Sequence, residues 1–129
     1  LRGLKIFDTI HIAIGNNPEK ERYFDVELIK NKIKELYKDE NKINIILYNE
    51  LTAEISKKLN ANFILRGLRN TTDFEFENSI SQINKDINKD LETVFLITSP
   101  KLAPISSTII RDVVKYGGDI NKYLPYKIN

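Results

Sequence analysis

Three stretches of the sequence place anion-binding side chains directly after an apolar run that is typical of a buried strand. They are Lys20 with Arg22, the segment Arg66-Gly67-Leu68-Arg69, and the segment Ile105-Ser106-Ser107-Thr108 followed by Arg111. Guanidinium groups bind phosphate through two hydrogen bonds, and a glycine between them allows close backbone approach. The N–H groups at the start of a helix bind phosphate too, and serine and threonine hydroxyls add donors. These stretches therefore predict a phosphate site.

A purely structural interpretation stays open for each stretch. The Ser-Ser-Thr run could cap a helix. The two arginines could form surface ion pairs with Asp73, Glu75 and Glu77. Lys20 taken alone would face solvent, as most lysines do. His11 lies within the apolar run Thr9 to Ile14, and we interpret it as structural. Only the convergence of the three stretches favours a binding site.

The residue types in these stretches suit a reaction in which one phosphate group attacks the phosphorus of another. The sequence shows no Ser-His-Asp, Cys-His or paired-carboxylate arrangement. A phosphomonoester is already an ionised nucleophile, so its attack on a nucleotide phosphorus needs positioning and charge neutralisation rather than a general base. Lysine and arginine side chains can position the two phosphates and neutralise their charge. Asp73, Glu75 and Glu77 are not spaced to form a metal site on a helix, so we predict no protein metal site.

The elements that must position these groups alternate between strand and helix patterns. Strands are predicted at Thr9 to Ile14, Ile43 to Tyr48, Asn62 to Leu65 and Thr93 to Ile97. Helices are predicted from the N-cap Asp25 to Tyr37, at Leu51 to Leu59, at Thr72 to Ile87, and at Ser106 to Lys115 with Gly117-Gly118 closing it. This alternation predicts an α/β domain in which one doubly wound parallel sheet carries helices on both faces. Its ligand should bind at the carboxyl edge of the strands.

Composition excludes several classes of function. The 129 residues suffice for a single domain, which we expect to span residues 1–129. Cysteine is absent and there is one histidine, which argues against disulfide, thiolate and zinc chemistry. The net charge of +2 gives no reason to expect nucleic-acid binding. No apolar run is long enough for a membrane span, so we expect a cytoplasmic protein.

Three motifs at these positions resemble those of the phosphopantetheine adenylyltransferases, which have a Rossmann-like nucleotidyltransferase fold. LRGLRNTTDFEFE, from Leu65 to Glu77, is similar to the RGLR segment of that family and its DFEYE-like helix start. ISSTIIRD, from Ile105 to Asp112, is shared more widely in the superfamily, and GGDINKYLP, from Gly117 to Pro125, resembles the closing segment of the family. The resemblance covers essentially the whole chain.

The resemblance implies a role for each matching residue. Lys20, Thr52 and Arg66 match positions that bind the pantetheine phosphate side of the substrate, and Lys20, Arg69 and Ser107 match positions that stabilise the transferring group. The positions that match ATP-binding residues are Gly67, Leu68, Arg69, Glu77, Leu102, Ala103, Pro104, Ile105, Ser106, Ser107 and Thr108. The chain departs from the family at Leu102-Ala103-Pro104, where an aromatic residue and a serine are usual.

The implied reaction is transfer of AMP from ATP to 4′-phosphopantetheine, which gives dephospho-coenzyme A and pyrophosphate. The resemblance also implies Mg²⁺ carried by the nucleotide, binding of coenzyme A, and a homo-hexamer. The family opens with a strand and a GTFDP…GH loop that have no counterpart before Leu1, so we expect the domain to be incomplete at its N-terminus by roughly 20 residues.

Two alternatives remain at this point. Another adenylyl- or cytidylyltransferase of the superfamily would share ISSTIIR, but LRGLRNTTDFEFE argues against it. A non-catalytic module that binds a nucleotide or coenzyme would share the anion-binding groups without the reaction.

Overall fold

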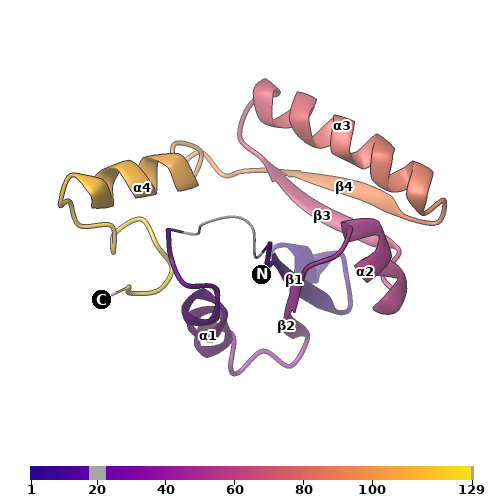
Figure 1. Ribbon diagram of the computed structural model, residues 1–129, viewed down its shortest axis with the longest axis horizontal. Helices are drawn as coiled ribbons and strands as arrows, with labels where there is room; N and C mark the ends of the chain where they lie inside the picture. Colours follow the sequence, from indigo (N-terminus) through magenta and orange to yellow (C-terminus); the bar gives the residue numbers. More distant parts are fainter. Residues whose placement is uncertain (18–22, 129) are drawn as a thin grey trace. The chain divides into compact units, whose positions relative to one another are not determined.

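Strands and helices alternate along the chain in a computed structural model that describes residues 1–17 and 23–128 (Figure 1). The strands are β1 (Ile10–Gly15), β2 (Ile43–Tyr48), β3 (Phe63–Leu68) and β4 (Glu92–Ile97). The helices are α1 (Val26–Leu36), α2 (Thr52–Lys58), α3 (Thr71–Ile87) and α4 (Ser107–Lys115), and a short 3₁₀ turn at Gly3–Lys5 precedes them. The predicted α/β class is confirmed.

The strands pair in parallel, as predicted. β1 pairs with β2 from Ile10 opposite Ile43 onward, and β3 pairs with β4 from Phe63 opposite Glu92 onward. Among the described residues, β1 with β2 and β3 with β4 each form a two-stranded parallel sheet. That the two pairs join in one continuous sheet stays a prediction.

The chain divides into two compact units. The first unit consists of Leu1–Asn49 with Ser106–Asn129, and the second unit of Glu50–Ile105. In the second unit α3 lies along the β3–β4 pair, with α2 against α3 (Figure 1). The rings of Phe74 on α3 and Phe95 on β4 meet edge to face, with their centroids 5.8 Å apart. This contact fixes the first turn of α3 against the sheet.

In the first unit, helix ends follow the predicted capping chemistry. Asp25 caps α1, since its Oδ1 accepts the backbone N–H of Leu28 at 2.8 Å. After α4, Gly117 has a φ of 74°, and the N–H groups of Gly117 and Gly118 donate to the carbonyls of Val114 and Val113. These two hydrogen bonds form the Schellman motif that ends many helices. Within the described part of the chain, no helix combines the length and apolar character needed to cross a membrane.

One predicted boundary is wrong in a way that affects the site. We expected the third strand to end at Leu65, but β3 continues to Leu68. Arg66, Gly67 and Leu68 pair with Phe95, Leu96 and Ile97 of β4, so they belong to the sheet rather than to a loop. A charged residue and a glycine mark a strand end by composition, but the partner strand still offers hydrogen-bonding groups up to Ile97, and the ladder continues along it.

Candidate active site

The candidate site of the second unit lies where β3 and β4 end. Arg69 directly follows β3, and the loop with Leu102, Ala103, Pro104 and Ile105 follows β4. Because the two strands are parallel and paired, both segments leave the same edge of the sheet. A hydrogen bond joins them: Nη1 of Arg69 donates to the carbonyl oxygen of Ile105 at 3.3 Å. The structure thus brings together two segments that the sequence placed in one phosphate site.

The side chain of Arg69 is fixed by Asp73 in the first turn of α3. Nε of Arg69 donates to Oδ2 of Asp73 at 2.8 Å, and Nη2 donates to Oδ1 at 2.9 Å. The backbone N–H of Arg69 donates to Oδ2 as well, at 3.0 Å. In the opposite direction, the backbone N–H of Asp73 donates to Oδ1 of Asn70, the N-cap of α3, at 2.9 Å. Asp73 therefore fixes both the arginine and the start of the helix, much as in a capping box.

A second ion pair of the same kind lies one helical turn further along α3. Nε of Arg66 donates to Oε2 of Glu77 at 2.7 Å, and Nη2 of Arg66 donates to Oε1 of the same carboxylate. Arg66 lies in β3 and Arg69 directly follows that strand, so each pair connects β3 or its end to the helix that covers the sheet. The alternative that the arginines form ion pairs is thus confirmed for Asp73 and Glu77. Glu75 forms no ion pair within the described residues.

In both pairs the arginine is more accessible than its carboxylate. The side chain of Arg66 is 49% exposed and that of Glu77 is 12% exposed. For Arg69 and Asp73 the exposed fractions are 33% and 21%. For Arg69, a carboxylate bound along one side of the guanidinium leaves other N–H groups for a further partner. The ion pairs are therefore compatible with anion binding and hold the cations in place for it.

Hydrogen bonding to Arg69 also changes the electrostatics of the pair. The side-chain bonds from Arg69, assisted by its backbone N–H, lower the pKa of Asp73 to about 2. The same pairing raises the pKa of Arg69 above its already high ordinary value. Both groups are therefore charged at any pH at which an enzyme is normally assayed.

Gly67 lies between the two arginines but is not required by packing. A Cβ atom built on Gly67 would meet only Oγ1 of Thr98, at 3.7 Å, which is ordinary van der Waals contact. The described residues would therefore tolerate a side chain at this position of β3. Close approach of a ligand remains the reason that the sequence suggests for this glycine.

The loop after β4 has a regular local structure. The N–H of Leu102 donates to the carbonyl of Ser99 at 2.9 Å, and the N–H of Ile105 donates to the carbonyl of Leu102 at 3.0 Å. Consecutive turns of this kind hold the backbone in a defined path. They present the carbonyl of Ile105 to Arg69.

In the first unit, Ser106 caps α4. Its Oγ accepts the backbone N–H of Ile109 at 3.2 Å, which confirms the capping interpretation for this serine. Ser107 is the first residue of the helix and is exposed. The hydroxyl of Thr108 accepts a hydrogen bond from Nη2 of Arg111 at 3.2 Å. The three hydroxyl residues thus have different surroundings, and Ser107 is the most suited to meet a ligand.

Some predicted site residues are not brought into this arrangement. Lys20 and Arg22 lie outside the described residues. Thr52 is the first residue of α2. The clustering of Lys20, Arg66, Arg69 and Ser107 in one pocket stays a prediction. His11 lies on β1, and within the described residues its Nδ1 is buried without a hydrogen-bond partner.

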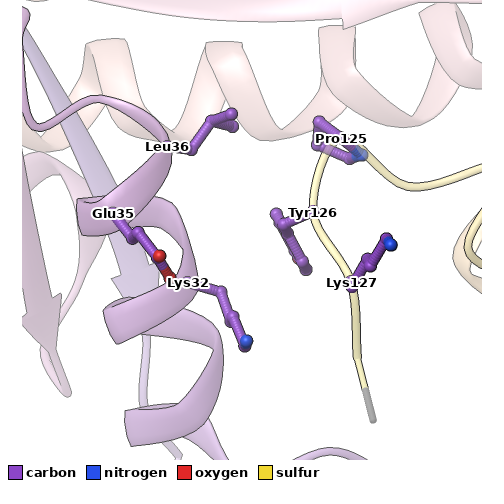
Figure 2. Close-up of a pocket in the computed structure, with 6 residues that line it drawn as sticks. All are labelled: Lys32, Glu35, Leu36, Pro125, Tyr126 and Lys127. Carbon is purple, nitrogen blue, oxygen red and sulfur yellow. The ribbon is translucent and has the colours of Figure 1, made fainter.

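A pocket of about 410 Å³ lies in the first unit, between α1 and the C-terminal segment (Figure 2). Its lining residues are Lys32, Glu35, Leu36, Pro125, Tyr126 and Lys127. Burial raises the pKa of Tyr126. None of the predicted site residues lines this pocket, so we do not assign it to the phosphate chemistry.

Comparison with known proteins identifies the family. The cytidylyltransferase-like family model matches residues 2–113. A phosphopantetheine adenylyltransferase of Cytophaga hutchinsonii is 55% identical over 127 residues, which are 98% of this chain and 85% of that protein. Proteins of the same name from Flavobacterium johnsoniae and Bacteroides thetaiotaomicron are 48% and 40% identical over 124 residues, 96% of this chain and 81% and 82% of theirs. The chain belongs to the phosphopantetheine adenylyltransferase family.

Membership in the phosphopantetheine adenylyltransferase family confirms the resemblance found in the motifs. It also gives the two arginines a context, since they lie at the carboxyl edge of paired parallel strands in a nucleotidyltransferase fold. The sequence alone left Asp73 as one of three acids that could neutralise them. Two spacings could have singled it out, namely four residues from Arg69 and three residues from the N-cap Asn70.

Proposed function

We propose that the protein transfers AMP from ATP to 4′-phosphopantetheine, producing dephospho-coenzyme A and pyrophosphate. The observation that carries this proposal is the pair Arg66 and Arg69 at the end of β3, each held by a carboxylate of α3, in a chain of the phosphopantetheine adenylyltransferase family. Such cations suit substrates whose reacting parts are both phosphates.

The reaction needs little covalent help from the protein. An oxygen of the pantetheine phosphate attacks the α-phosphorus of ATP, a new P–O bond forms, and the bond to the β-phosphate breaks. Pyrophosphate leaves with the bonding electrons. The attacking phosphate is ionised at neutral pH, so a general base is unnecessary, and catalysis depends on alignment and on neutralising charge.

In this proposal each of the two arginines acts on a different substrate. Arg66, with Lys20 and Thr52, binds the pantetheine phosphate. Arg69, with Lys20 and Ser107, stabilises the transferring group, while Gly67, Leu68, Glu77 and the segment 102–108 bind ATP. The 3.3 Å bond from Arg69 to Ile105 supports this assignment, because it links Arg69 to the segment assigned to ATP.

The carboxylates near the arginines do not fit a resident metal. Asp73 and Glu77 are each paired with an arginine, and no group of three metal-ligating side chains occurs within residues 1–17 and 23–128. In this proposal Mg²⁺ enters with ATP, bound to the phosphates of the nucleotide. We further propose that the protein works in the cytoplasm as a homo-hexamer. Exposed apolar side chains on α3, such as Phe76 and Ile83, support self-association.

The test is a pyrophosphate-release assay of the complete protein with ATP and 4′-phosphopantetheine. We expect turnover with this pair, and much less when CTP replaces ATP or nicotinate mononucleotide replaces the acceptor. Those two controls separate the proposal from the other transferases of the superfamily. Calorimetric binding of coenzyme A without any turnover would instead favour a non-catalytic module. Sedimentation of the same sample tests the hexamer.

A further inference from the structure

We infer that Asp73 is a positioning residue for catalysis: it fixes the guanidinium of Arg69 so that two of its N–H groups point to the phosphates of ATP. This inference rests on the proposed function, because it concerns how Arg69 acts in that reaction. It assigns to Asp73 a task beyond helix capping.

The hydrogen-bonding capacity of Arg69 supports this role. A guanidinium has five N–H donors. Three are used within the described residues, by Nε and Nη2 on Asp73 and by Nη1 on Ile105. Five minus three leaves two donors, one on Nη1 and one on Nη2. A phosphate accepts hydrogen bonds from guanidinium N–H groups, and these two are the donors that Arg69 retains for it.

The restraint on Arg69 is unusually complete for a residue that is one third exposed. Its backbone N–H and its side chain bind the same carboxylate, so both ends of the residue are tied to the first turn of α3. Exposed arginines otherwise lose considerable rotamer freedom when they bind a ligand. Because that freedom is already restricted here, the contact with the phosphates costs less entropy and is better aligned in the transition state.

Asp73→Asn is the decisive substitution. Asparagine has the same shape, but one acceptor oxygen becomes an NH₂ group, which cannot accept a bond from Arg69. We expect ATP affinity to fall about tenfold and kcat to fall about tenfold or more, whereas KM for 4′-phosphopantetheine stays within about twofold. The matched control is Glu75→Gln, which removes the same charge from the same helix at an exposed position outside the ion pairs. It should leave all three quantities unchanged.

A double-mutant cycle with Arg69→Lys separates positioning from a general structural effect. Lysine keeps the charge but lacks the planar guanidinium fork that binds a carboxylate or phosphate through two parallel hydrogen bonds, so Arg69→Lys should weaken ATP binding and turnover by itself. If Asp73 acts through Arg69, adding Asp73→Asn to Arg69→Lys causes little further loss. Fully additive losses, or normal ATP affinity and kcat in Asp73→Asn, would overturn the inference.

Calorimetry and turnover are measured on the same samples, so the two proposals can fail separately. A wild-type protein that binds ATP but does not release pyrophosphate would refute the proposed function, while the cycle in ATP affinity would still test Asp73. A wild-type protein that does not bind ATP would overturn the inference about Asp73 as well.

Discussion

Arg66 and Glu77 form an ion pair through two hydrogen bonds, with Nε of Arg66 2.7 Å from Oε2 of Glu77. The resemblance to the family assigned Glu77 to the nucleotide and Arg66 to the pantetheine phosphate. In the structure, the carboxylate and the guanidinium are direct partners. A substitution of Glu77 should therefore weaken the binding of 4′-phosphopantetheine, because it releases the side chain of Arg66.

Glu77→Gln should raise KM for 4′-phosphopantetheine several-fold, in addition to its effect on the binding of ATP. Glutamine removes the charge and one of the two acceptor oxygens, so Arg66 is no longer held in one orientation. Steady-state kinetics with each substrate varied in turn measure both constants, and Glu75→Gln again controls for the lost charge. An unchanged KM for 4′-phosphopantetheine would show that Glu77 does not act through Arg66.

Gly67→Ala should affect ATP affinity and the free energy of unfolding differently. The added Cβ meets only Thr98 Oγ1 at 3.7 Å, so the free energy of unfolding should stay equal or rise by up to about 1 kcal/mol, because alanine loses less backbone entropy than glycine. If ATP passes close to this backbone, its affinity should fall nonetheless. Chemical denaturation and calorimetry measure the two effects. Unchanged ATP affinity would mean that the glycine is not there for the ligand.

The ion pair of Arg69 and Asp73 can be observed by its titration. NMR of the Asp73 carboxyl should give a pKa of about 2 in the wild-type protein and a higher pKa in Arg69→Gln, which stays below the ordinary value because the backbone N–H of residue 69 still donates to the carboxylate. Because the pKa is lowered in the folded state, the stabilisation is present above the ordinary carboxyl pKa and is lost as the pH falls through about 2. Turnover should therefore show no acid limb from Asp73 above pH of about 5. An ordinary pKa in the wild-type protein would contradict the pair.

Local sequence signals predicted the parts of the structure that depend on neighbouring residues. The cap Asp25, the closing Gly117-Gly118 and the capping role of Ser106 all follow from side chains within four residues of the helix end, and all three are confirmed. The parallel direction of the strands was predictable as well, since each connection contains a helix.

The parts that failed depend on partners far apart in the sequence. The end of β3 is set by how far β4 extends beside it, so Arg66 could not be placed in the strand from its own neighbourhood. The sequence also left open which acidic residue pairs with each arginine, because the pairing depends on how α3 lies on β3.

Alanine substitutions at the adjacent residues Ser106 and Ser107 should have different effects, the first on stability and the second on kcat. Ser106 is the N-cap of α4, so Ser106→Ala should lower the free energy of unfolding by about 1 kcal/mol. Ser107 is exposed at the first position of the helix, where alanine is favourable, so Ser107→Ala should leave stability nearly unchanged. If the Ser107 hydroxyl stabilises the transferring phosphoryl group, its removal should nevertheless lower kcat by about 10²-fold, with little change in KM. Thermal unfolding and pyrophosphate release are measured for both variants. Equal kcat for wild type and Ser107→Ala would remove Ser107 from the transition-state contacts.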